Sequence, residues 1–113
     1  MDKESALALR TKTQRPIMVL LDLLGRRWAL RVLWELRDAP LTSRALRDAA
    51  GGISPTVLQT RMNELREAGF VQLDNHGYSL TPLGRDLLKA FKPLYSFADI
   101  WVSTVKPVGA DPE

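Results

Sequence analysis

The residues best suited to a chemical task lie in the middle of the chain, between residues 54 and 68. At helical spacing, this segment carries outward hydroxyl and amide side chains with an arginine at their edge. Amide side chains form paired hydrogen bonds with adenine, and arginine pairs with guanine or binds phosphate. We therefore expect Thr56, Gln59 and Thr60 to face the base edges of DNA, with Arg61 and Asn63 nearer its backbone. The alternative is a plain solvated face, because Gln, Thr and Asn are common on any surface helix.

Further polar residues near this segment each have a functional and a purely structural interpretation. Ser43 and Arg44 begin the preceding helical segment, and Ser54 begins the segment of residues 54–68. Free N–H groups at a helix N-terminus bind phosphate, but a serine there also serves as a simple helix cap. His76 follows Asp74 in a turn-forming cluster, where it is either a DNA contact or an ordinary turn residue.

The composition of the 113 residues excludes several classes of site. With no Cys and one His, a disulfide framework, a thiol nucleophile, a thiolate zinc site and any site with two imidazoles are excluded. No nucleophile–base set or metal-ligand spacing is present. The carboxylates, such as Asp22, Glu35, Asp48 and Glu64, are all interpretable as surface groups of helices. We therefore expect no enzyme, no cofactor and no metal.

The charge of the chain favours a polyanionic partner, although only modestly. The formal net charge is +3 and the sequence pI is about 9.6. Residues 1–40 hold eight basic and five acidic residues, whereas residues 70–113 hold four basic and five acidic residues. No signal-peptide pattern is visible, and no apolar run approaches the roughly 20 residues of a membrane span. These features predict a cytoplasmic protein without a membrane partner.

Apolar spacing and helix-stop signals predict the elements that position the candidate residues. We expect helices over residues 16–25, 27–37 and 43–50, followed by the helix of residues 54–68. Either Thr42 or Ser43 caps the third of these helices. A short glycine-bearing turn joining two helices, the second polar on its outer face, is typical of a helix-turn-helix. The expected inner faces are Leu30, Leu33, Trp34 and Leu36; Ala45, Leu46 and Ala49; and Val57, Leu58, Met62 and Leu65.

The hydrophobic period changes after Gly69, and two short strands are expected there. Residues 75–77 form a turn signal, which predicts a hairpin with Val71 and Leu73 on its buried face. A long helical pattern then runs over about residues 82–105, which Pro93 must kink or split. This order predicts a mainly α (α+β) fold, a winged helix-turn-helix with a small β-hairpin wing and flanking N- and C-terminal helices for dimerisation.

The last helical pattern carries apolar and aromatic residues that one small domain cannot cover. We therefore expect a homodimer whose interface includes Leu87, Phe91, Leu94, Tyr95 and Trp101. An intrachain core and a pocket for a small-molecule effector are the alternatives for the aromatic residues. The expected domain covers residues 15–105, between a polar lead-in over residues 1–14 and a flexible tail over residues 106–113.

In this order and spacing, residues 15–101 resemble the HxlR-type winged helix-turn-helix regulators of bacteria. The matching residues are Pro16, Leu21, Gly25, Arg27, Trp28, Leu30, Leu33 and Leu36, then residues 51–54, 57–58, 62, 64–65 and 69–71, and finally residues 78–81 and 84–85. The resemblance implies a dimeric, sequence-specific regulator of transcription that binds double-stranded DNA. Its recognition helix would be the helix of residues 54–68, inserted in the major groove.

Three features depart from that family pattern. Arg15 stands where the family has a cysteine that senses oxidants or electrophiles in some members, so that mechanism cannot operate here. The hairpin is short, and its tip over residues 74–77 is poorly suited to holding phosphate. The family's Pro and Trp of the last helix match Pro93 and Trp101 only with an extra helical turn. A protein-interaction module on the same scaffold is the alternative function, because a fold does not fix a function.

Overall fold

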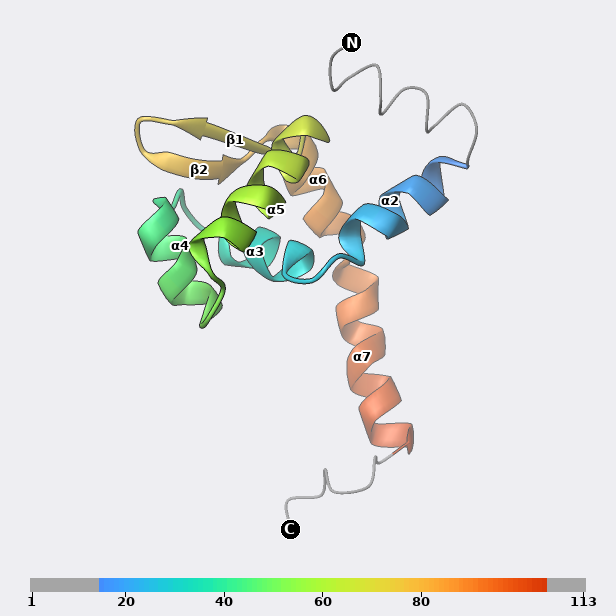
Figure 1. Cartoon of the computed structure of the whole chain (residues 1–113). Coiled ribbons are helices and arrows are strands. Elements are labelled where there is room, and N and C mark those ends of the chain that lie inside the picture. The colour runs from blue at the N-terminus through green and yellow to red at the C-terminus, as the bar shows by residue number, and fades with distance from the viewer. Residues whose placement is uncertain (1–14, 106–113) are drawn as a thin grey trace.

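The computed structural model describes residues 15–105, so the expected lead-in and tail lie outside the described residues. The elements in chain order are α2 (Pro16–Leu24), α3 (Ala29–Glu35), α4 (Ser43–Ala50), α5 (Pro55–Glu67), β1 (Val71–Asp74), β2 (Gly77–Leu80), α6 (Pro82–Ala90) and α7 (Lys92–Val105). Figure 1 shows α4, α5 and the hairpin gathered on one side, with α3 behind α5 and α7 extending away. The predicted winged helix-turn-helix is confirmed.

The first two helices meet at a corner that differs from the prediction. α2 begins at Pro16 and ends before Gly25, as expected, because proline fits the first helical position. α3 begins later than predicted, since Trp28 has a left-handed backbone with a φ of 77°. That conformation is rare for a bulky residue, so helical spacing around Trp28 gave no sign of it.

Local capping defines both helices of the helix-turn-helix. Thr42, not Ser43, caps α4, because its Oγ1 accepts a hydrogen bond from the Ala45 N–H at 3.1 Å. Ser54 caps α5 in the same way, with its Oγ 3.1 Å from the Val57 nitrogen. Each cap satisfies one N–H that the helix itself leaves without a partner.

The hairpin is tied to the helix-turn-helix by a third segment of chain. β1 and β2 pair antiparallel, with Val71 opposite Leu80 and Asp74 opposite Gly77. Leu41, just before α4, forms an isolated bridge with Tyr78 through hydrogen bonds of 2.9 and 2.8 Å. Gly77 has a φ of 110° and lies so close to the Leu41 backbone that a Cβ at residue 77 would collide with it.

The core lies between α3, α4, α5 and the hairpin. Its largest fully buried side chains are Leu33, Leu36, Leu46, Met62, Leu65 and Val32. Several predicted inner-face residues are not buried: Leu30, Trp34, Val57 and Leu73 are 36–47% exposed. In the hairpin, buried and exposed residues do not alternate: β2 is buried along its whole length, whereas Val71 alone is buried in β1. The prediction that Leu73 is buried, which assumed alternation, is therefore wrong.

The long C-terminal pattern is split into two helices, as Pro93 required. α6 ends at Ala90 with Phe91 as its C-cap, and α7 begins at Lys92. α6 packs on the body, because Gly84 approaches the Phe70 carbonyl so closely that any side chain would collide. α7 has no buried residue. It extends away from the body (Figure 1), and its large apolar residues are 42–60% exposed.

Candidate nucleic-acid interface

The outward face of α5 presents the predicted polar side chains in an ordered arrangement. Thr56, Gln59 and Thr60 are exposed, and Asn63 is half-buried beside them. The Gln59 Nε2 donates a hydrogen bond of 2.9 Å to the Asn63 Oδ1. The Thr60 hydroxyl donates one of 3.1 Å to the Thr56 carbonyl. The Gln59–Asn63 bond holds both amides on the outer face, while the Gln59 Oε1 and the Asn63 Nδ2 stay available for other partners.

The start of α4 offers backbone donors beside an exposed arginine. Because Thr42 already accepts from Ala45, the hydroxyl of Ser43 does not cap the helix. Ser43 and Arg44 are the first two residues of α4, and both are exposed. Their N–H groups precede the first intrahelical bond, which the Leu46 N–H makes to the Thr42 carbonyl. Such an N-terminus, with a cation next to it, favours a phosphate.

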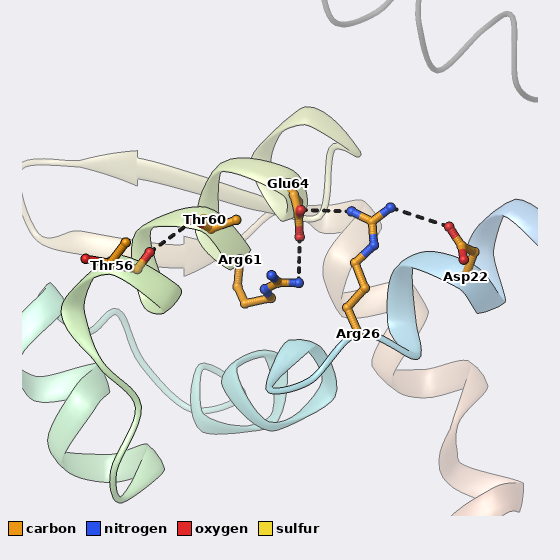
Figure 2. Close-up of polar contacts among 6 residues, drawn as sticks. All are labelled: Asp22, Arg26, Thr56, Thr60, Arg61 and Glu64. Carbon is orange, nitrogen blue, oxygen red and sulfur yellow. Dashed lines mark hydrogen bonds and ion pairs between the residues drawn. The ribbon is translucent and has the colours of Figure 1, made fainter.

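The predicted arginine of α5, Arg61, is engaged within the protein. Its Nη1 lies 3.1 Å from the Glu64 Oε1, and 19% of its side chain is exposed. Glu64 also binds Arg26, whose Nη1 is 2.8 Å from the Glu64 Oε2. Arg26 in turn contacts Asp22 at 3.4 Å. Figure 2 shows Arg26 between Asp22 on α2 and Glu64 on α5, so these ion pairs connect the two helices.

The tip of the hairpin agrees with the turn interpretation of its histidine. The His76 backbone N–H donates to the Asp74 Oδ1 at 2.8 Å, which closes the turn. The imidazole Nδ1 lies 3.7 Å from the same carboxylate oxygen, and 83% of the His76 side chain is exposed. The histidine thus lies beside an acidic group while remaining accessible from outside.

Arg66 is a candidate that the sequence-based reasoning missed. It follows Gln59 and Asn63 at the i, i+4, i+7 spacing, so the three form one stripe along α5. Asn63 and Arg66 line a groove of about 410 Å³ between α5 and β1, together with Gln72. The Arg66 side chain is exposed and has no partner within residues 15–105. The spacing of Arg66 from Gln59 and Asn63 in the sequence could have identified it as part of this face.

Comparison with known proteins shows which family this chain belongs to. The HxlR-like helix-turn-helix family matches residues 23–106. The chain belongs to the HxlR-like helix-turn-helix family. A curated relative, an uncharacterized HTH-type transcriptional regulator of Synechocystis sp., is 29% identical over 94 residues, covering 77% of this chain and 70% of the relative.

Solved structures resemble this HxlR-like chain as well. Quinone-bound YodB from Bacillus subtilis has a TM-score of 0.70 at 28% identity, covering 74% of this chain and 94% of YodB. A MarR-family transcriptional regulator from Enterococcus faecalis V583 has a TM-score of 0.68 at 23% identity, covering 92% of both chains. The second likeness concerns the fold alone. The family and its relatives identify this chain as a DNA-binding regulator of transcription.

The predicted dimer residues of this HxlR-like chain fall into two groups. Leu87 is 9% exposed and belongs to the intrachain core, and Phe91 packs at its edge, so the chain itself covers both. Leu94, Tyr95 and Trp101 are 42–53% exposed on α7. The sequence-based list omitted other exposed apolar residues: Phe97, Ile100, Val102 and Val105 on α7, and Ile17, Met18 and Leu21 on α2.

Neither a metal-binding cluster nor a membrane-spanning helix is present among residues 15–105. Within residues 15–105, no three His, Asp or Glu side chains lie together in a way that would hold a metal ion. In the same residues, no helix combines the length and the apolar character needed to cross a membrane.

Proposed function

We propose that this HxlR-like regulator acts as a sequence-specific homodimer that inserts α5 into the major groove of DNA. The observation that carries the proposal is the outward face of α5, where Thr56, Gln59 and Thr60 are exposed. The Gln59–Asn63 bond of 2.9 Å prepares these amides for base edges, since it fixes their orientation before binding. Ser43, Arg44 and Ser54 supply phosphate contacts at two helix N-termini.

The arginines of α5 contribute unequally to this binding. Arg61 contributes less to DNA binding than its charge implies, because its guanidinium is paired with the Glu64 carboxylate. Arg66 lies on the same helix without such a partner within residues 15–105 and contacts the DNA backbone. His76 touches DNA only from the edge of the site, since the short hairpin carries it beside Asp74.

The dimer is proposed to form through the apolar face of α7, extended by α2. Residues at i, i+3, i+7 and i+11 of one helix lie on one side, and Leu94, Phe97, Trp101 and Val105 have this spacing. All four are more than half exposed in a single chain. Pairing two such faces removes them from water and sets the two α5 helices at half-sites about 10 base pairs apart or a multiple of that.

The signal that this regulator answers is proposed not to be cysteine oxidation. YodB, which shares the fold, was solved with quinone bound and in a reduced form. The 113 residues of the present chain contain no cysteine, and Arg15 stands where the resemblance places the sensing thiol. Whatever reaches this regulator must bind without thiol chemistry.

A titration of labelled genomic fragments against the purified chain, followed by fluorescence anisotropy, tests the proposal. At moderate salt, at least one fragment should bind about a thousandfold more tightly than random DNA. Gln59→Ala should relax specificity at one base position. Equal binding of all fragments would favour the alternative of a protein-interaction module, which the neutralised Arg26 and Arg61 support.

Arg66→Gln and Arg61→Gln form a matched pair for the backbone contacts. Arg66→Gln should weaken binding to all sequences and reduce the salt slope by about one unit, because one phosphate contact is lost. Arg61→Gln should change the slope less, since the Arg61 charge is already paired. Identical slopes for both variants and the unmodified chain would contradict a backbone contact by Arg66.

A further inference from the structure

A cavity that is open to solvent lies where α7 joins the body, and no residue of α5 lines it. Its volume is about 470 Å³, within the roughly 300–1,000 Å³ typical of small-molecule sites. It is lined by the end of α3 and the segment after it, by the last residue of β2, by α6 and by the start of α7. A ligand here would therefore touch both the winged-helix body and the helix that we assign to dimerisation.

The walls of the cavity are mostly apolar and include two aromatic rings in contact. The rings of Trp34 and Tyr95 meet edge to face, with centroids 5.2 Å apart. Leu88 and Leu80 complete the apolar wall. Trp34 and Tyr95 remain 38% and 42% exposed, so part of this aromatic surface is available to a ligand. Such a wall suits a flat hydrocarbon ring.

The rim of the cavity is strongly basic. Arg85, Lys89 and Lys92 all line it, and none has a side-chain partner within residues 15–105. Arg37 is a fourth cation, held over the Trp34 ring at 4.1 Å and bonded to the Trp34 carbonyl at 3.0 Å. The single acidic group of the lining is Asp38, which lies 3.6 Å from the Arg37 Nε. The cations therefore outnumber the acid, and their charge is not compensated locally.

We propose that this cavity binds a small organic anion that combines an aromatic ring with a carboxylate. The ring packs against Leu88 and Tyr95, and the carboxylate binds Arg85, Lys89 or Lys92 by charge-assisted hydrogen bonds. Because the site spans α3, α6 and α7, a bound anion fixes the direction of α7 relative to the body. This regulatory consequence rests on the proposed dimeric function, since the direction of α7 sets the distance between two α5 helices.

Binding can be tested on the full chain without DNA, with 2-naphthoate as the probe and neutral 2-naphthylmethanol as its matched control. The sequence has three tryptophans, so an NMR spectrum resolves three indole N–H signals, which Trp34→Phe assigns. We expect 2-naphthoate to shift the Trp34 signal most and to slow amide exchange at the start of α7. The neutral alcohol should bind about tenfold more weakly, because it lacks the charge.

The double variant Lys89→Gln/Lys92→Gln should weaken 2-naphthoate binding about tenfold or more. Both lysines are exposed and helical, so the fold should survive, and circular dichroism checks this. Arg47→Gln is the control, since it removes an unpaired helical cation outside the cavity. Equal binding of acid and alcohol, a shift centred on Trp101, or unchanged affinity in the double variant would overturn the site.

DNA binding then separates this inference from the proposed function. Saturating 2-naphthoate should change the affinity for the target DNA at least about fivefold, the low end of allosteric coupling, and should not do so in the double variant. If the anion bound at Trp34 while no DNA bound, the cavity would stand and the proposed function would fall. If the double variant weakened DNA binding and its salt slope without ligand, the lysines would be phosphate contacts and the ligand site would fall.

Discussion

Two helices of nearly equal length, α5 with 13 residues and α7 with 14, differ in whether the chain buries their apolar residues. α5 buries Leu58, Met62 and Leu65 inside the chain and leaves its polar face outside. α7 buries nothing, and its large apolar residues are 42–60% exposed. The helix proposed to read DNA by polar contacts is thus anchored within one chain, whereas the exposed apolar face of α7 is the face proposed to pair with a second chain.

Substitutions of apolar residues should therefore have different effects in the two helices. A buried residue of α5 supports the core of the whole domain, because that core is shared with α3, α4 and the hairpin. Apart from Tyr95, whose ring packs against Trp34, an apolar residue of α7 supports only the contact with whatever covers it. Substitutions on the two helices should therefore be distinguishable, the first by folding and the second by assembly.

The largest effect is expected for Leu65→Ala in α5. Leu65 is fully buried, so its truncation leaves a cavity and should lower the free energy of unfolding by about 2–5 kcal/mol. Urea denaturation followed by circular dichroism measures this loss. Leu94→Ala on α7 is the control and should lower the stability of the isolated monomer far less. Equal losses in the monomer would contradict the contrast between the helices.

The next effect concerns assembly rather than folding. Trp101→Glu should place a charge in the proposed α7 interface and convert the dimer to a monomer, because burying an unpaired charge is costly. Analytical ultracentrifugation gives the molecular mass, and circular dichroism should show the helices of the body unchanged. A dimer that persisted in Trp101→Glu and in Leu94→Glu would place the interface elsewhere.

A smaller effect separates two adjacent hydroxyl groups at the start of α4. Thr42→Ala should lower the free energy of unfolding by about 1 kcal/mol, because it removes the cap on the Ala45 N–H. Ser43→Ala should leave stability within about 0.5 kcal/mol, the usual range for surface substitutions. Thermal denaturation compares the two variants. Similar losses at both positions would refute the assignment of Thr42 as the cap.

The smallest effect is expected for the ion pair between α2 and α5. A double-mutant cycle with Arg26→Gln and Glu64→Gln should give a coupling energy of about 0.2–1 kcal/mol, since both groups are partly exposed. Added salt should reduce the coupling. A coupling of zero would mean that α2 is oriented by its apolar contacts alone.

The sequence predicted the elements whose causes are local. Proline at the first position of α2 and α5, the Ser54 cap and the division at Pro93 all act within a few residues of themselves. The same holds for the outward position of Gln59 on α5, which follows from helical spacing.

The features that the sequence did not predict depend on contacts between distant segments. Trp28 adopts its left-handed backbone while packing against the core, which helical spacing does not reveal. The pairing of Arg26 with Glu64 joins residues far apart in the chain. The burial of β2 depends partly on Leu41, which precedes the helix-turn-helix in the sequence, whereas β2 follows it.

The bridge between Leu41 and Tyr78 has a mechanical consequence for the wing. Leu41 immediately precedes the Thr42 cap of α4, so the hairpin and the start of the helix-turn-helix share one short hydrogen-bonded joint. A force that tilts the hairpin must also pull on the first turn of α4. The backbones of Gly77 and Leu41 are packed so closely that no side chain fits between them. The wing is therefore coupled to the start of α4 through backbone hydrogen bonds, so a displacement of the hairpin would be transmitted to the helix-turn-helix.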